Sequence, residues 1–141
     1  MQIKNKHKQA HMRAAHVYAK CSTAKRLNVG ALIVKDDRII SIGYNGMPSG
    51  WDNVCEDENN KSRPEVLHAE SNAIAKLARS SESGEGSSIF ITHSPCLDCA
   101  KMIYQSGIKQ VYYSNEYRST DGVDFLNKCN ITVEQLSVED T

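Results

Sequence analysis

The sequence lacks three features, each of which would point to a particular class of protein. It has no excess of charge, because 17 basic residues balance 17 acidic ones, and this argues against a protein that grips long nucleic acid through a cationic face. Its longest strongly apolar runs, 31–34 and 39–42, are far shorter than the roughly 20 residues that span a bilayer. No apolar stretch follows the N-terminal lysines, as a secretory signal would require. We therefore expect one cytoplasmic domain, residues 1–141, with no membrane partner.

Two residue types are also scarce or unpaired. Aromatic residues make up only 6% of the sequence, and no strip of aromatic and basic residues is present that could stack the bases of RNA. The cysteines number five, an odd count that does not suit a scaffold of disulfides. The sharpest pair, Cys96 and Cys99, has the Cys-x-x-Cys spacing of metal sites and thiol chemistry.

The order of helix and strand patterns predicts the fold. A first helix is expected at 6–24, from an apolar stripe of Ala10, Ala14, Val17, Tyr18 and Cys21. A hairpin with a turn at 35–37 follows, and then a long loop at 45–65 that is either functional or disordered. Helices and strands then alternate, which implies parallel crossovers and a three-layer α/β/α domain with a central five-stranded mixed sheet. The expected strands are 29–34, 38–44, 89–92, 111–114 and 131–136, and the later helices are 68–79, one from the Ser94-Pro95 cap to Gly107, and 120–129.

Two short segments carry the chemistry: His68-Ala69-Glu70 and Pro95-Cys96-Leu97-Asp98-Cys99. Each is expected at the start of a helix. Cys96 and Cys99 are three residues apart, so on a first helical turn their sulfurs face the same side and can share a metal ion. His68 supplies a third ligand. Structural zinc sites have four protein ligands, whereas a catalytic site leaves one position for water, so this set predicts one catalytic Zn²⁺ per subunit.

Glu70 is the expected proton shuttle of that site. His-x-Glu followed by Pro-Cys-x-x-Cys is the signature of zinc nucleobase deaminases. Zinc activates water for attack on the ring carbon that bears the amino group. Glu70 takes the proton of that water, delivers it to the ring nitrogen and then protonates the departing ammonia. Redox motifs and structural zinc ribbons share Cys-x-x-Cys, but the two segments together favour deamination.

From about residue 10 to residue 136 the sequence resembles the cytidine deaminase superfamily, and within it the deoxycytidylate (dCMP) deaminases, including those of phages. Besides the zinc segments, the resemblance rests on 29–34 (Val-Gly-Ala-Leu-Ile-Val), 42–50 (Ile-Gly-Tyr-Asn-Gly-Met-Pro-Ser-Gly) and 68–74. It implies hydrolysis of dCMP, a small-molecule nucleotide, to dUMP and ammonia. It further implies a homo-oligomer, a hexamer, that dCTP activates and dTTP inhibits.

The resemblance also implies roles for single residues. Asn45 would contact the sugar hydroxyl of the substrate, and Ala69 is a further substrate-binding candidate. Gly43, Tyr44 and Gly46 would shape a regulatory pocket, although each glycine can equally be a plain turn residue. Some relatives hold a second, structural zinc near the long loop. Because this loop offers Cys55 but no histidine lies between residues 17 and 67, no second metal is expected.

The substrate phosphate requires a cationic partner. Arg26 is the first candidate, because a bidentate guanidinium suits a phosphate dianion, although an isolated arginine is often a solvated surface residue. Tyr117 and Arg118 follow a strand end at the expected carboxyl rim of the sheet, where α/β proteins bind ligands. Cys21 and Cys129 are expected to pack in the core, and His93 has no assigned role.

Two alternatives to dCMP deamination stay open. One is a deaminase of another cytosine or adenine substrate, either a nucleoside or transfer RNA, and the other is a zinc-stabilised binding module without catalysis. The balanced charge argues against RNA, and the stretch 42–50 argues against a nucleoside. The presence of Glu70 argues against the binding module, because a structural site needs no carboxylate beside an open coordination position.

Overall fold

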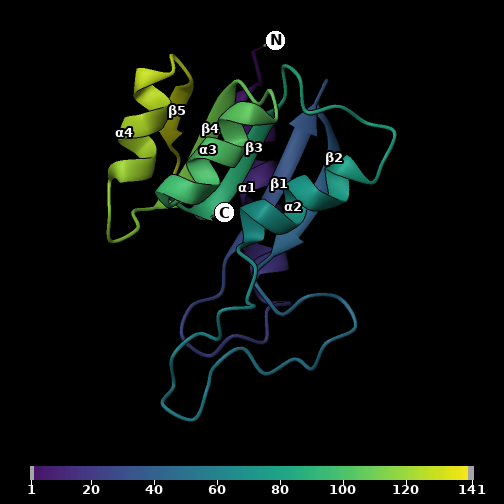
Figure 1. The fold of residues 1–141 in the computed structure, drawn as a ribbon. Coiled ribbons are helices and arrows are strands. Elements are labelled where there is room, and N and C mark those ends of the chain that lie inside the picture. Colours follow the sequence, from purple (N-terminus) through teal and green to yellow (C-terminus); the bar gives the residue numbers. More distant parts are fainter. Residues whose placement is uncertain (1, 140–141) are drawn as a thin grey trace.

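A five-stranded sheet forms the centre of the computed structural model, which describes residues 2–139 (Figure 1). The strand order is β2-β1-β3-β4-β5. β1 pairs antiparallel with both β2 and β3, while β3, β4 and β5 run parallel to one another, so the sheet is mixed as expected. The strands are β1 (Gly30–Lys35), β2 (Arg38–Tyr44), β3 (Ser88–His93), β4 (Gln110–Asn115) and β5 (Thr132–Gln135).

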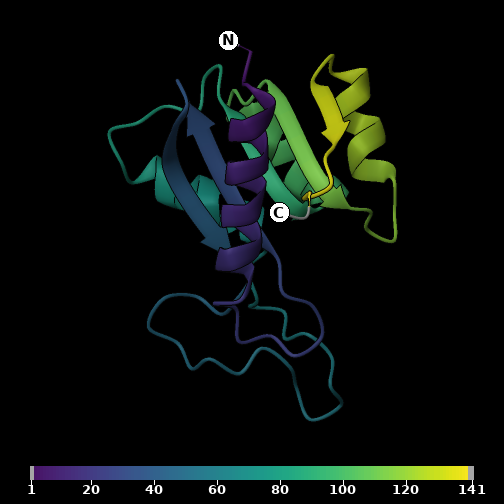
Figure 2. The same cartoon turned by 180° about the vertical axis from the view of Figure 1, so that it is seen from behind.

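Helices cover both faces of this sheet. They are α1 (Asn5–Ala19), α2 (Ala69–Ala78), α3 (Leu97–Gln105) and α4 (Asp121–Lys128). α1 lies alone on one face, and the other three helices lie on the opposite face (Figure 2). Alternate strand residues point to opposite faces of the sheet and so belong to two separate cores. Leu32 and Phe90 lie under α1, and Ile33 and Ile91 lie under the other helices. The three-layer α/β/α prediction is therefore confirmed.

The face of α1 that packs on the sheet matches the predicted stripe only in part, with Ala14 and Tyr18 partly buried against the core. Met12, Ala15 and Ala19 are buried, whereas Val17 of the expected stripe is 60% exposed and Cys21 is exposed beyond the end of the helix. The reason is a close approach of two backbones: a Cβ on Gly30 would lie 2.0 Å from the carbonyl oxygen of Ala15. Only small residues fit that contact, so packing decides the buried face and the predicted core role of Cys21 is wrong.

The segment between β2 and α2 forms the predicted long loop. Residues 45–68 contain no helix and no strand, only isolated bridges between Gly46 and Leu67 and between Glu56 and Ser62. In Figure 1 this loop extends below the sheet, next to the chain that joins α1 to β1. Across the described residues 2–139, no helix is long and apolar enough to span a membrane.

Candidate active site

The starts of α2 and α3 bring the predicted metal ligands together. His68 is the N-cap of α2, Cys96 is the N-cap of α3, and Cys99 lies in the first turn of α3. The Nδ1 atom of His68 is 3.6 Å from the sulfur of Cys96 and 3.3 Å from that of Cys99. In the described part of the chain, this is the only group of three or more His, Cys, Asp or Glu side chains whose ligand atoms all lie within 4.8 Å of one another.

These distances fit a zinc ion. With Zn–S bonds near 2.3 Å and Zn–N bonds near 2.0 Å, a tetrahedral site separates nitrogen from sulfur by about 3.5 Å. The two distances from His68 to the sulfurs bracket that value. One imidazole and two thiols are a donor set that zinc prefers, and three protein ligands leave the fourth position open.

The ligand group is polarised before any metal binds. Hydrogen bonds with Cys99 and His68 lower the pKa of the Cys96 thiol to about 4. The hydrogen bond with Cys96, followed by burial, raises the pKa of Cys99, and the same thiolate raises the pKa of His68. The lowered pKa of Cys96 favours its thiolate form, and a thiolate in turn favours a cation at this position.

Glu70 lies beside this group in the first turn of α2 and is only 4% exposed. Burial raises the pKa of its carboxyl group to about 7. A carboxyl group with such a pKa can both take up and release a proton near neutral pH, as a general acid and base must.

The predicted Ser94 cap at the start of α3 is absent, because the N-cap residue is Cys96. Ser94 was expected to cap the helix, but its Oγ accepts a hydrogen bond from the backbone N–H of Tyr117 at 2.7 Å. The helix begins only at Leu97. α4 supports this start closely, because a Cβ on Gly122 would lie 2.1 Å from the carbonyl oxygen of Pro95.

A cavity of about 680 Å³ opens beside the ligand group, a size typical of small-molecule sites. Its wall combines the helix starts with the 45–68 loop, the segment before β1 and the segment after β4. All the substrate candidates named from the sequence line it, namely Arg26, Asn45, Ala69, Tyr117 and Arg118.

The polar candidates differ in how the protein already uses them. Asn45 accepts a hydrogen bond from the N–H of Val29 at 2.8 Å and donates one to the carbonyl of Leu27 at 2.7 Å. Its amide therefore joins the chain before β1 to the end of β2 by two hydrogen bonds. By contrast, no carboxylate of the described residues forms an ion pair with Arg26 or Arg118.

The candidates for a regulatory pocket lie outside this cavity. Gly43 packs under α2, where a Cβ would lie 2.3 Å from the carbonyl oxygen of Ala69. The carbonyl of Tyr44 accepts a hydrogen bond from Asn72, and its ring lies 5.6 Å from the ammonium of Lys76. Gly46 bonds to Leu67 across the base of the loop.

Sequence reasoning gave no role to several other residues of the cavity wall. His93 lines it, paired in register with Asn115 of the neighbouring strand, and hydrogen-bonds through Nδ1 to Thr92. Glu56 lines it from the middle of the loop. Strand register could have indicated His93 and Asn115, because parallel strands end at the same edge. No periodicity indicates Glu56.

Comparison with known proteins agrees with a zinc-binding deaminase site. The family model for the cytidine and deoxycytidylate deaminase zinc-binding region matches residues 5–115. The structure of the dCMP deaminase of cyanophage S-TIM5, in complex with dCMP and dUMP, aligns with a TM-score of 0.94 and 50% identity, covering 96% of this chain and 100% of that chain.

Two curated relatives are more distant. ComE operon protein 2 of Bacillus subtilis is 37% identical over 137 residues, which cover 94% of this chain and 72% of that protein. Human deoxycytidylate deaminase is 38% identical over 119 residues, which cover 78% of this chain and 66% of the human protein. The match therefore leaves about a third of the human protein without a counterpart.

Proposed function

The chain belongs to the cytidine and deoxycytidylate deaminase zinc-binding family, and from this premise we propose that it is an enzyme that hydrolyses dCMP to dUMP and ammonia. The observation that carries the proposal is the group of His68, Cys96 and Cys99 with buried Glu70 at the wall of a nucleotide-sized cavity. Further support comes from the cyanophage relative, a dCMP deaminase whose structure contains both dCMP and dUMP.

Each residue of the group has a distinct part in the chemistry. His68, Cys96 and Cys99 hold Zn²⁺, which when bound supplies the Lewis acidity that activates water for hydrolysis. Glu70 takes a proton from the attacking water and delivers it to the ring nitrogen next to the reacting carbon. It then takes the second proton of that water from the hydroxyl group on the attacked carbon and passes it to the amino group; the carbon–nitrogen bond breaks and ammonia leaves. The raised pKa of Glu70 suits both transfers.

The rest of the cavity wall is proposed to bind the nucleotide. Arg26 and Arg118 carry guanidinium groups without an ion-pair partner among residues 2–139, and a phosphate dianion is the partner that such groups favour. Tyr117 lies beside Arg118 in the same wall. Ala69 and Asn45 border the space for the base and the sugar.

The proposal extends to assembly and regulation, by resemblance. The enzyme is a single-domain subunit of a cytoplasmic homo-oligomer, a hexamer, and the cytoplasm is that of the host if the gene is carried by a phage. dCTP activates it and dTTP inhibits it. The position of Gly43, Tyr44 and Gly46 outside the cavity supports a regulatory site separate from the substrate site.

The test is ammonia release by the zinc-loaded protein from dCMP, deoxycytidine, CMP and cytosine in parallel, each with and without dCTP and dTTP. We expect dCMP to be the best substrate, with kcat/KM about 100-fold or more above deoxycytidine, because removal of the phosphate leaves cationic partners unpaired. Equal turnover of deoxycytidine would contradict the substrate assignment. If all four compounds were inert to zinc-loaded protein, nucleic-acid substrates or a binding module would replace the proposal.

A further inference from the structure

Glu56 is a charged residue of the cavity wall that the chemistry above does not use. It is only 7% exposed, although it lies in the middle of the 45–68 loop. One of its carboxylate oxygens, Oε2, accepts hydrogen bonds from the backbone N–H groups of Lys25 at 2.9 Å and Arg26 at 3.3 Å. No basic side chain within residues 2–139 forms an ion pair with it.

The second oxygen of Glu56 has an unused capacity to accept hydrogen bonds. Oε1 has no donor among the described residues. Oε1 is not among the fully buried side-chain atoms that lack a partner, so it keeps some exposure, and Glu56 is a residue of the cavity wall. A carboxylate oxygen held in such a place gains most from a donor on a bound ligand.

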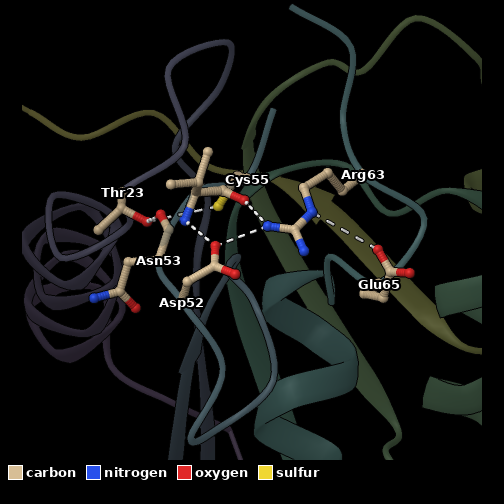
Figure 3. Close-up of polar contacts among 7 residues, drawn as sticks. Thr23, Asp52, Asn53, Cys55, Arg63 and Glu65 are labelled. Atoms are coloured by element: carbon tan, nitrogen blue, oxygen red, sulfur yellow. Dashed lines mark hydrogen bonds and ion pairs between the residues drawn. The ribbon is translucent and has the colours of Figure 1, made fainter. Parts of the chain in front are cut away.

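The loop holds this carboxylate in a fixed position. Its neighbour Cys55 is buried, with its sulfur 3.6 Å from the Oγ1 of Thr23 and its carbonyl bonded to the N–H of Arg63 at 2.8 Å. The guanidinium of Arg63 bonds in turn to Asp52 at 2.7 Å, as Figure 3 shows. An acceptor that is already oriented requires little ordering when a ligand binds.

The chemistry of dCMP limits what can donate to Glu56. The phosphate dianion repels a carboxylate, and the ring carbonyl and ring nitrogen are acceptors. Only the 4-amino group and the 3′-hydroxyl of the sugar are donors. The amino group is the leaving group, so it lies at Glu70 and the metal ligands, and the 3′-hydroxyl is the donor that remains.

We propose that Glu56 accepts a hydrogen bond from the 3′-hydroxyl of the deoxyribose and makes that hydroxyl a determinant of substrate choice. This inference rests on the proposed function. By resemblance the sugar hydroxyl belongs to Asn45, whose Oδ1 already accepts from the N–H of Val29 and whose Nδ2 already donates to the carbonyl of Leu27. The second N–H of that amide can still donate to the oxygen of the hydroxyl, while the proton of the hydroxyl needs an acceptor. Glu56 offers the acceptor that the protein has left unused.

The test compares dCMP with 2′,3′-dideoxycytidine 5′-monophosphate, which lacks only the 3′-hydroxyl. For the wild-type enzyme we expect kcat/KM to be about 10- to 100-fold higher for dCMP, as for a hydrogen bond to a charged group. In Glu56→Ala the preference falls below about threefold, because only dCMP loses a contact. Glu56→Gln preserves the size of the side chain, so it shows a reduced preference even if the alanine variant folds poorly.

The matched control is Glu58→Gln, two residues further along the same loop, where the side chain is exposed and makes no hydrogen bond or ion pair with the described residues. It should retain the wild-type preference. If Glu56 only holds the backbone of Lys25 and Arg26, Glu56→Ala weakens both substrates equally and the unchanged ratio overturns the proposal. A ratio that collapses in Asn45→Ala but not in Glu56→Ala also overturns it. A wild-type enzyme inert toward dCMP instead rejects the proposed function itself, and this inference with it.

Discussion

The two sides of the cavity are built in different ways. The zinc side presents His68, Glu70, Cys96 and Cys99 from the starts of two helices that pack on the central sheet. The other side is the loop before His68, residues 45–67, which has no helix or strand and depends on polar contacts of its side chains, such as those of Arg63 with Asp52 and with the carbonyl of Val54. The proposed chemistry thus rests on packed backbone, while the proposed recognition of the nucleotide rests in part on a polar loop, together with the segments before β1 and after β4.

This difference has an energetic consequence. Groups that are fixed by core packing open only with a large part of the protein, whereas exposed polar contacts in a loop open locally and at low cost. Changes on the zinc side should therefore act on turnover and on global stability. Changes on the loop side should act on substrate affinity, with little effect on either.

The largest effect should come from Glu70→Gln. Glutamine keeps the shape of the buried side chain but cannot carry the proton, so kcat should fall by about 10²- to 10⁴-fold. Zinc content should stay at one ion per chain, because Glu70 is not a member of the ligand group. Ammonia release and metal analysis of the same purified sample measure the two quantities.

Cys99→Ala is the matched contrast to Glu70→Gln, because it removes a ligand and leaves the proton shuttle in place. This variant should lose both zinc and activity. Loss of zinc in Glu70→Gln as well would show that Glu70 supports the metal group itself, and the separation of ligand and shuttle would not hold.

The next effect should come from Gly43→Ala, which probes the support under the zinc side. The added Cβ would meet the carbonyl oxygen of Ala69 at 2.3 Å and the backbone nitrogen of Ala73 at 2.6 Å. Backbone cannot yield as a flexible side chain does, so we expect a loss of about 1–3 kcal/mol in the free energy of unfolding, measured in urea.

Gly46→Ala is the control for Gly43→Ala, since its Cβ would meet no atom within 4 Å. It should change the free energy of unfolding by less than about 0.5 kcal/mol. If Gly43→Ala instead left stability intact and altered only the response to dCTP or dTTP, the role implied by resemblance, in a regulatory pocket, would replace the packing role.

Local patterns in the sequence were sufficient to predict the zinc side. The spacing of Cys96 and Cys99 places both at the start of α3. His68 stands at the start of the preceding helical pattern, which forms α2. The hairpin turn was equally local, because Asp36 and Asp37 adopt the positive φ angles of a two-residue turn. Such features depend only on residues a few positions away, so they can be predicted from the sequence alone.

Features that depend on distant parts of the chain were missed. The buried face of α1 follows from its contact with Gly30, and the role of Ser94 follows from Tyr117, 23 residues away. Glu56 is the clearest case, since its partner Lys25 lies 31 residues earlier. The path of the loop between them follows no helical or strand period, so no pattern could place this carboxylate in the cavity.

The smallest effect, and the one that tests the loop side directly, should come from Arg63→Ala. Its ion pair with Asp52 is partly exposed, with 26% of the Arg63 side chain and 57% of the Asp52 side chain accessible, and its guanidinium also donates to the carbonyl of Val54. Such contacts contribute about 1 kcal/mol each, so the free energy of unfolding should fall by no more than about 2 kcal/mol. Substrate binding must then order a looser loop, which should raise KM for dCMP up to about fivefold while kcat stays within twofold. Arg38→Ala, which removes an exposed pair with Glu82 away from the cavity, should leave both constants unchanged. A fall in kcat at unchanged KM in Arg63→Ala would mean that the loop also positions the reacting groups, and the division between the two sides would have to be abandoned.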